Sequence, residues 1–389
     1  MLPGRTVFAE LMTHVSLHKF QTCVARYDGD YKSSRFSCWD QYLCMAFAQL
    51  TYRESLRDIE ACLRAVQSKL YHVGIRARVA RSTLGEANEH RDWRIYADFA
   101  QGLIRTARDL YVDEPLAMDL ANTVYALDAT VIDLCLSVFP WAHYRRRDAA
   151  IKLHTQVDLR GLIPTVVHVT EGKRPDVTFL DDLHLEAGAV YIMDRGYVDF
   201  ARLHRFTTEA AFFVTRTKRG IRFRRRVSHA VDAATGLRSD HTVGLATATA
   251  RRDYPTALRR VHFVDPTTAK RLVFLTNNFT LPALTITQLY KSRWQVELFF
   301  KWIKQHLRIK AFYGTSENAV KTQIWIALSV YVLVAIVRKR LALDVSLSKL
   351  LQILSITLFE KTPISIAVFD SGSQFDEGDD GNQLQLFDL

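Results

Sequence analysis

The chain has 389 residues, and its 52 Lys and Arg against 41 Asp and Glu give a formal charge of +11. At roughly 100–200 residues per domain, this length predicts two or three domains with buried cores. A content of 48% apolar and 24% charged residues excludes an intrinsically disordered chain. The basic excess favours an anionic partner, with nucleic acid as the first candidate.

Cysteine content and hydropathy indicate the cellular compartment in which the chain is expected. The five cysteines are odd in number and lack C-x-x-C spacing, which argues against a disulfide scaffold or structural zinc and fits a reducing cytoplasm. The N-terminal residues show no apolar stretch of the kind that a signal peptide needs. The most apolar run, residues 324–337, is shorter than the ~20 residues that span a bilayer. We therefore expect a buried core helix there and no membrane partner.

Residues 1–115 predict a helical domain. Apolar side chains recur at helical spacing over residues 39–50, and a second amphipathic segment at 56–63 follows a short break. A third segment begins at Ser82, a residue type that suits an N-cap. A helix, a tight turn and further helices are the outline of a helix-turn-helix module.

The same region is basic. Residues 61–85 contain five Lys or Arg and no Asp or Glu, and they lead into a candidate recognition helix at 82–90. The side chains expected to contact DNA there are Arg78, Arg81, Thr83, Asn88 and Arg91. A solvated basic face on a helical bundle would produce the same pattern.

From residue 120 the pattern changes to strands. Runs rich in β-branched and aromatic residues predict strands at 124–134, 151–159, 163–169 and 189–193. Further strand-like pieces between about 202 and 285 include 211–215, 221–227, 260–264 and 272–276. Helices resume at 286–308, 320–341 and 347–354. The expected fold class is therefore mixed α/β, preceded by an all-α N-terminal domain.

The segment Tyr290–Lys310 carries the most informative pattern. On a helix, Arg293, Glu297 and Lys304 fall within an arc of about 60°, and Lys301 lies beside them. Apolar residues from Leu289 to Leu307 occupy the adjacent face. An amphipathic helix with an Arg293–Glu297 ion pair on a solvated face would show the same pattern.

Two strand-borne aspartates favour a functional site. Asp128 lies inside an apolar strand, where an ionised carboxylate is costly unless it is paired or metal-bound, and Asp194 ends another apolar strand. With Glu297 they put three carboxylates on separate elements, which could together hold two divalent cations. Mg²⁺ or Mn²⁺ prefers oxygen ligands, and a metal pair about 4 Å apart suits in-line phosphoryl transfer.

Four other aspartates are not expected in this site, either because they point to the opposite face of a strand or because they lie in a polar segment. Asp133 follows Asp128 by an odd number of residues, so on one strand it points to the opposite face. Asp199 relates to Asp194 in the same way if that strand continues as far as Asp199. Asp181 and Asp182 lie in a polar segment and are expected at the surface or at helix caps.

Together these residues resemble a known family. Asp128, Asp194 and Glu297, with a Y-x2-R-x3-E-x6-K spacing, look like the insertion-sequence-4 family of DDE transposases, in its Tyr-Arg-Glu-Lys subgroup. The four residues at that spacing are Tyr290, Arg293, Glu297 and Lys304. The segment Asp194-Arg195-Gly196-Tyr197 matches the family's D-x-G-[FY] element. The resemblance covers about residues 120–345 with specific motifs and, more diffusely, the helical region before them.

The resemblance implies a ribonuclease H-like catalytic core with a β-rich insertion at about 202–285. The expected domains are then a helical DNA-binding domain at 1–115, the catalytic domain at 116–369 and an acidic disordered tail at 370–389. It also implies that the catalytic acids Asp128, Asp194 and Glu297 hold two Mg²⁺ ions, for which Mn²⁺ substitutes. The residues expected to hold DNA phosphates are Tyr290, Arg293, Lys301 and Lys304.

The insertion supplies a second basic surface. Residues 202–226 contain nine Lys or Arg and one acid. Arg222, Arg224 and Arg226 alternate, so on a strand they form a row on one face that suits a phosphate backbone. Residues 145–147, all arginine, make a further cluster near the first aspartate.

The last 20 residues differ from the rest in charge and composition. Residues 370–389 hold six acids and no Lys or Arg, so the remaining chain has 52 basic against 35 acidic residues and a charge of +17. The peptide Gln383-Leu384-Gln385-Leu386-Phe387 is similar to the Q-L-x-L-F peptide with which bacterial proteins dock on the replication sliding clamp. Such a short pattern also arises by chance, so clamp binding by Gln383, Leu384, Leu386 and Phe387 is a hypothesis.

These observations predict a transposase of the prokaryotic cytoplasm, associated with the nucleoid. We expect it to bind double-stranded DNA at terminal inverted repeats as a homodimer in a synaptic complex, to cut the ends, and to join them to target DNA. Two alternatives remain. A divalent-metal DNA nuclease with the same core would cut without joining, and a transposase-derived repressor would only bind DNA, although the intact acidic set counts against the repressor.

Overall fold

The structure is a computed structural model. It describes the chain except residues 1–4, 32–34, 76–77, 117–119, 121, 146–147, 307–311 and 373–389. Its internal contacts divide the chain into two compact units. The helical unit comprises residues 1–110, 306–314 and 318–389, and the sheet unit comprises residues 111–305 and 315–317.

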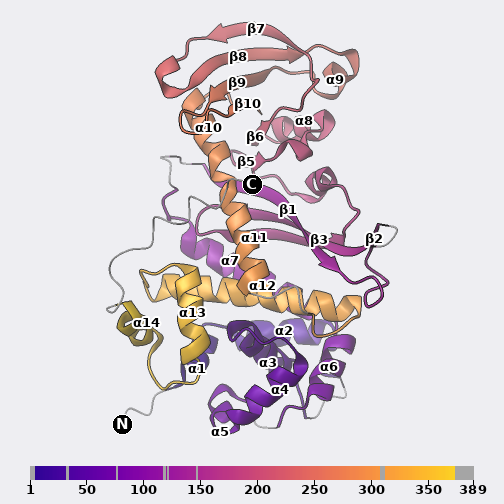
Figure 1. Cartoon of the computed structure of the whole chain (residues 1–389), viewed down its shortest axis with the longest axis vertical. Helices are drawn as coiled ribbons and strands as arrows, with labels where there is room; N and C mark the ends of the chain where they lie inside the picture. The colour runs from indigo at the N-terminus through magenta and orange to yellow at the C-terminus, as the bar shows by residue number, and fades with distance from the viewer. Residues whose placement is uncertain are drawn as a thin grey trace. The chain divides into compact units, whose positions relative to one another are not determined.

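The helical unit is built from helices at both ends of the chain (Figure 1). Those from the N-terminal part are α1 (Val7–Thr13), α2 (Leu17–Arg26), α3 (Cys38–Leu50), α4 (Leu56–Ala65), α5 (Gln67–Leu70), η1 (Tyr71–Val73), α6 (Arg81–His90) and α7 (Arg94–Tyr111). Those from the C-terminal part are α12 (Glu317–Arg340), α13 (Leu347–Thr357) and α14 (Ile364–Gly372). Side-chain caps begin many of them, and Ser37 and Asp40 form a full capping box at α3.

Helix α12 is the core of this unit. Its side chains are buried almost continuously over residues 319–337, so it needs partners on every side. Ser329 Oγ donates to Tyr42 Oη at 3.3 Å, and Asn318 Nδ2 donates to Asn88 O at 2.9 Å. By length and composition α12 alone, among the described residues, could cross a membrane, but 94% of its apolar window is buried in the protein. The prediction of a buried core helix at 324–337 is therefore confirmed.

The division differs from the domain boundaries expected from sequence. Residues 116–369 were expected to form one catalytic domain, yet residues 318–369 belong to the helical unit. The physical reason is the all-round apolar surface of α12, which packs with the N-terminal helices. The sheet unit therefore ends at residue 317, before the expected domain boundary at 369.

The sheet unit contains one ten-stranded sheet. In chain order, the first half of this unit comprises β1 (Val124–Leu134), β2 (His143–Arg145), β3 (Asp148–Asp158), β4 (Ile163–Glu171), η2 (Asp176–Asp182), β5 (Val190–Met193), η3 (Arg195–Tyr197), α8 (Phe200–Thr208) and β6 (Phe212–Arg216). Its second half comprises β7 (Phe223–His229), η4 (Ala233–Thr235), β8 (Leu237–Leu245), α9 (Ala248–Asp253), β9 (Leu258–Val264), β10 (Arg271–Thr276), α10 (Ala283–Ser292) and α11 (Trp294–His306).

The strand order places the two halves side by side. The order is β2-β3-β1-β5-β6-β10-β9-β8-β7, with β4 paired to β3 (Figure 1). Strand β1 is antiparallel to β3 and parallel to β5, and β5 is parallel to β6. Helix α8 and strand β6 thus complete a parallel β-α-β unit with β5. The inserted strands begin after Arg216, later than the expected boundary near 202. The reason is that β6 pairs with β5 in the central sheet, and α8 connects these two strands.

Candidate functional site

The first two acids are brought together by strand register. Leu127 of β1 pairs with Met193 of β5 in the parallel ladder, so Asp128 and Asp194 each follow the last paired residue. Asp194 follows the carboxyl end of β5, whereas Asp128 lies within β1, which continues to Leu134 beside β3. The two acids therefore lie where the parallel β1–β5 ladder ends, and sites form at the carboxyl ends of parallel strands in many α/β folds. Asp128 Oδ1 accepts from Ala129 N at 2.8 Å, and Asp194 Oδ1 accepts from Gly196 N at 2.7 Å.

Gly196 is needed for the second of these contacts. A Cβ at this position would lie 2.8 Å from Asp194 Oδ1, closer than real side chains approach. The glycine therefore lets the backbone hold the carboxylate. Thr215 Oγ1, from β6, donates to the Asp194 carbonyl at 2.9 Å and fixes the backbone on the other side.

The third acid comes from α11. Val296, Phe299 and Ile303 bury one face of this helix, as the sequence pattern predicted, and Glu297 lies on its exposed side. The helical segment is interrupted at Arg293, between α10 and α11. Arg293 Nη1 donates to Asp128 Oδ2 at 2.8 Å, and Arg293 Nη2 pairs with Glu297 Oε1. One guanidinium thus links a carboxylate of the sheet to a carboxylate of the helix.

Burial and neighbouring charges shift the pKa values of Asp128 and Tyr290 in this site. Burial raises the pKa of Asp128 to about 6; the Arg293 charge opposes this rise, and the negative charges of Asp194 and Glu297 add to it. Burial also raises the pKa of Tyr290, whose hydroxyl is affected by the charges of Arg293, Arg216 and Asp194. These mutual effects place all three acids in one electrostatic neighbourhood.

The pKa of Asp128 gives a stability prediction. The group is raised from its ordinary value of 3.8 to about 6 in the folded protein, so the folded protein binds this proton more tightly than the unfolded chain. The free energy of unfolding should therefore fall as pH rises from about 4 to about 6, and Asp128→Asn should escape this loss. We expect the variant to gain on the order of 2 kcal/mol over the wild type between pH 4 and pH 7. Urea unfolding at both pH values measures the difference, and a constant difference would contradict the assignment.

Asp128, Asp194 and Glu297 offer the ligand atoms of a divalent-cation site, although Arg293 forms ion pairs with two of them in this structure. Three carboxylates from separate elements match the oxygen ligands that Mg²⁺ and Mn²⁺ prefer. Burial is the main cause of the raised pKa of Asp128, and the negative charges of Asp194 and Glu297 add a smaller part; a bound cation would counter both effects. Among the described residues, no three His, Cys, Asp or Glu lie close enough to hold one ion. The residues therefore fit a divalent cation in type, although their side chains are not grouped around one ion position in this structure.

The remaining residues of the predicted signature lie on the same two helices. Tyr290 is half-buried in α10 against Phe274, with ring centroids 5.0 Å apart. Lys301 is exposed on α11, and Lys304 is half-buried one turn further. The structure also identifies Arg216, which the sequence interpretation missed. Arg216 ends β6, next to the strand that carries Asp194, and its charge acts on Tyr290.

The aspartates excluded by parity and context do lie outside the site. Asp133 is exposed near the end of β1, and Asp199 caps α8 by accepting from Arg202 N at 3.1 Å. Asp181 pairs with Arg202 at 2.7 Å, and Asp182 accepts from His168 Nδ1 at 3.0 Å. Asp181 is exposed, as predicted, whereas Asp182 is half-buried and also pairs with Arg174 at 2.5 Å. Because β5 ends at Met193, the alternation of strand faces does not apply to Asp199.

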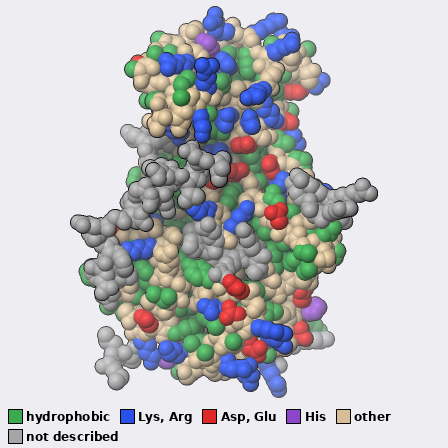
Figure 2. Space-filling model, viewed as in Figure 1, with side chains coloured by type: hydrophobic (Ala, Val, Ile, Leu, Met, Phe, Trp, Pro, Cys, Tyr) green, Lys and Arg blue, Asp and Glu red, His purple; other side chains and the backbone are tan. Residues whose placement is uncertain are grey.

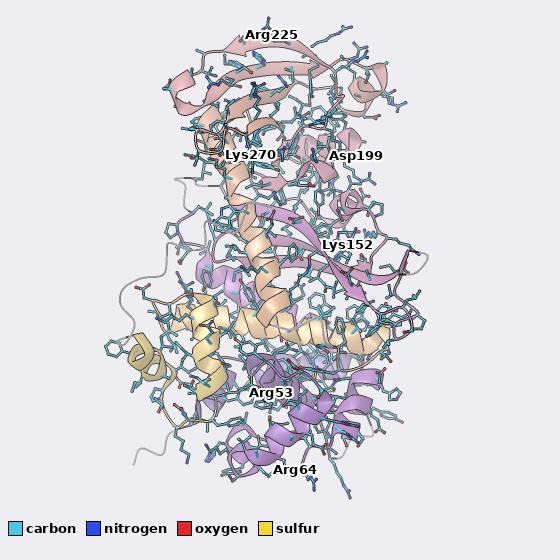
Figure 3. The ribbon with its side chains drawn as sticks, in the orientation of Figure 1. Arg53, Arg64, Lys152, Asp199, Arg225 and Lys270 are labelled. Atoms are coloured by element: carbon cyan, nitrogen blue, oxygen red, sulfur yellow. The ribbon has the colours of Figure 1, made fainter. Side chains whose placement is uncertain are left out.

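The basic row predicted in the insertion is exposed but not regular. Strand β7 is the edge of the sheet, and Arg222, Arg224 and Arg226 are all exposed. A register shift between Arg225 and Val227 breaks the alternation that the sequence implied. Gly244 on β8 leaves room for Arg226, since a Cβ there would lie 3.0 Å from Arg226 Nε. Lys and Arg side chains gather over this end of the sheet (Figure 2), and Arg225 is labelled on β7 in Figure 3.

The helix-turn-helix candidates in the helical unit divide into exposed and buried groups. Arg78, Arg81 and Thr83 are exposed at the start of α6. Asn88, by contrast, is only 1% exposed, and its Oδ1 accepts from Gln41 Nε2 at 2.7 Å. The prediction that Asn88 contacts DNA is therefore wrong for this structure, because α6 turns this position toward α3.

Arg91 is held by contacts with backbone and side-chain oxygens. Its guanidinium donates to Ser37 O at 2.8 Å and to Gln41 Oε1 at 3.1 Å, which favours a structural role. Several predicted residues lie outside the described part of the chain. They are Arg146, Arg147, Leu307 and the clamp-binding candidates Gln383, Leu384, Leu386 and Phe387.

Comparison with known proteins adds independent findings. The family model described as "Transposase DDE domain" matches residues 120–333, and a domain of unknown function, DUF4372, matches residues 3–76. A Sinorhizobium fredii protein named as a transposase, y4zB, is 32% identical over 72% of this chain and 78% of its own length. A Geobacillus stearothermophilus protein is named "Probable transposase for insertion sequence element IS5377" and is 32% identical over 59% of this chain and 58% of its own.

One solved structure also aligns with most of the chain. It is titled "Cryo-EM structure of piggyBac transposase synaptic complex with hairpin DNA (SNHP)" and aligns over 96% of this chain and 85% of its own, at 10% identity. The TM-score is 0.44, which is too low for the alignment to support an argument about this fold.

Proposed function

The chain belongs to the transposase DDE domain family and is a DNA transposase, an enzyme that cleaves and transfers DNA strands; from this premise we propose that Asp128, Asp194 and Glu297 form its catalytic centre. The observation that carries the proposal is the register of β1 and β5. It brings Asp128 and Asp194 to the point where the parallel β1–β5 ladder ends, and Arg293 links Asp128 to Glu297.

We assign the core to the ribonuclease H-like class and the chain to the Tyr-Arg-Glu-Lys subgroup. The strand order β4-β3-β1-β5-β6, antiparallel on one side of β1 and parallel on the other, supports the fold assignment. The subgroup assignment is supported by Tyr290, Arg293 and Glu297, whose charges or hydroxyls act on one another in the structure.

Divalent-cation dependence is general in the transposase DDE domain family, and we infer two Mg²⁺ ions here, with Mn²⁺ as a substitute. Cations bound to the three acids would activate water and stabilise charge on the reacting phosphate. The chain itself supplies the ligands and orients the DNA. Tyr290 donates one oriented hydrogen bond, and the cations of Arg216, Lys301 and Lys304 neutralise phosphates on either side.

The proposal is tested by supplying DNA ends and a target plasmid with Mg²⁺. A transposase yields plasmid joined covalently to the cut ends. A nuclease yields nicked DNA without joined product, and a repressor leaves the DNA intact. The end sequence comes from the inverted repeats that flank the reading frame.

Arg216 gives a specific prediction for DNA binding. Arg216→Ala should weaken binding of an end duplex by about three- to tenfold and reduce the salt dependence by about one counterion, because one phosphate contact is lost. Fluorescence anisotropy at several salt concentrations measures both quantities. Lys173→Ala is the control, since Lys173 is an exposed cation of the same unit that pairs with Glu171 at 2.6 Å. Equal effects of the two substitutions would contradict the assignment.

We also propose three broader properties. The exposed cations of β7 and of the start of α6 are DNA-binding surfaces, and two copies of the chain hold two DNA ends in a synaptic complex. The protein acts in the cytoplasm on the nucleoid, which its five free cysteines support. Mass photometry with an end duplex tests the homodimer: a complex of two chains and two duplexes supports it, and a complex of one chain and one duplex contradicts it.

A further proposal concerns the C-terminal peptide. The sequence from Gln383 to Phe387 supports docking on the bacterial sliding clamp. Anisotropy with a labelled peptide of the last ten residues should show saturable binding to purified clamp. The same peptide with Leu386 and Phe387 replaced by Ala should not bind. Absence of binding by the natural peptide would refute this docking mode.

A further inference from the structure

Arg293 contacts two of the three acids assigned to cation binding. Its Nη1 lies 2.8 Å from Asp128 Oδ2, and its Nη2 pairs with Glu297 Oε1. The side chain is 18% exposed, and its Nε is buried with no hydrogen-bond partner. A guanidinium and a divalent cation would therefore compete for the same carboxylate oxygens.

The position of Arg293 in the chain fits such a competition. It lies at the interruption between α10 and α11, four residues before Glu297 and outside the buried face of α11. Its guanidinium is 5.9 Å from the ring centroid of Tyr290, another residue assigned to phosphate contact. A guanidinium pairs with phosphate as well as with carboxylate, in both cases by parallel hydrogen bonds. Arg293 thus has two alternative partners: the acids and a DNA phosphate.

We propose that Arg293 couples cation binding to DNA binding. In the protein without DNA, Arg293 neutralises Asp128 and Glu297 and weakens their binding of a divalent cation. When DNA is bound, a backbone phosphate takes the guanidinium and leaves both carboxylates to the cation. The inference rests on the proposed function, because it takes the three acids as the cation site.

The coupling must be reciprocal. If DNA strengthens cation binding by some factor, the cation strengthens DNA binding by the same factor. The consequence for the enzyme is that the free protein holds divalent cations weakly. The complete centre then assembles on DNA.

The competition is tested with Mn²⁺ and the full chain in the absence of DNA. The paramagnetic signal of free Mn²⁺ gives the dissociation constant of the wild type, Arg293→Gln and Arg216→Gln. Arg216 is the charge-matched control: its charge acts on the same tyrosine, and the structure shows no ion pair for it among the described residues. We expect Arg293→Gln to tighten Mn²⁺ binding by at least about tenfold and Arg216→Gln by less than about threefold.

Each of the other possible outcomes contradicts a stated part of the proposal. Equal dissociation constants for the wild type and Arg293→Gln would overturn the competition, as would weaker binding by that variant. Similar tightening by both variants would show a general charge effect and no competition. Asp128→Asn separates this proposal from the proposed function: if it leaves Mn²⁺ binding unchanged, the cation site itself is wrongly assigned.

The reciprocal arm uses a pre-cut duplex of the element's terminal inverted repeat with Ca²⁺, which takes the same kind of oxygen ligands. Ca²⁺ should strengthen duplex binding by the wild type more than it strengthens binding by Arg293→Gln. An equal effect of Ca²⁺ on the two proteins would refute the coupling, whatever their absolute affinities.

Discussion

Asp128→Asn should reduce cleavage of end DNA by at least roughly 1,000-fold, equivalent to about 4 kcal/mol of transition-state stabilisation. The amide keeps the shape of the side chain but removes the charge that a cation ligand requires. Binding of the end duplex should not weaken, because the substitution removes no DNA-binding cation and releases Arg293 from one of its two acids. Cleavage of a labelled duplex with Mg²⁺ and anisotropy without metal measure the two effects.

The matched control for this prediction is Asp133→Asn on the same strand. Asp133 is exposed near the end of β1 and lies away from the site. This variant should cut at the wild-type rate. If Asp128→Asn cuts normally, or if both variants fail alike, the assignment of the first acid is wrong.

Asp240→Ala should destabilise the sheet unit by about 3–5 kcal/mol, because it leaves a buried arginine without a counter-charge. Arg259 Nη2 lies 2.7 Å from Asp240 Oδ2, and the two side chains are only 8% and 5% exposed. This pair joins β8 to β9, the strands that support the basic edge strand β7. Thermal unfolding followed by circular dichroism measures the loss.

An exposed ion pair of the same unit provides the comparison. Asp253 pairs with Arg252, whose side chain is 77% exposed, so Asp253→Ala should cost between about 0 and 1 kcal/mol. Equal losses in the two variants would show that burial of the Asp240–Arg259 pair does not govern its contribution.

Local pattern was sufficient for several elements. Strand β1 spans Val124–Leu134, the range predicted from its β-branched and aromatic residues. The apolar face of α11 was also predicted, because helical spacing is a property of neighbouring residues. The proximity of Asp128 and Glu297 to one guanidinium agrees with the grouping inferred from the resemblance.

Features set by long-range packing were not predictable in this way. Apolar spacing continues past Arg293, so the interruption between α10 and α11 left no local signal. Strand β8 was not predicted, because Arg238, Asp240 and His241 interrupt its apolar pattern, although Asp240 is buried against Arg259. The packing of α12 with the N-terminal helices depends on residues hundreds of positions away.

The surroundings of two side chains, Asn88 and Arg216, were likewise not predictable from the local sequence. Asn88 looked available for DNA, but the helix turns it toward Gln41. Arg216 was one of many cations between residues 202 and 226, and only the pairing of β6 with β5 distinguishes it. A signal was present in its position at the carboxyl end of a strand, once β6 is recognised as part of the central sheet.

The most direct test of the catalytic centre is strand transfer with pre-cut ends, which bypasses the first cleavage. If one acidic centre serves both reactions, Glu297→Gln should join no pre-cut ends to a target plasmid with Mg²⁺, while Lys173→Ala joins them at the wild-type level. Normal joining by Glu297→Gln would contradict the central claim that Asp128, Asp194 and Glu297 together carry both cleavage and transfer.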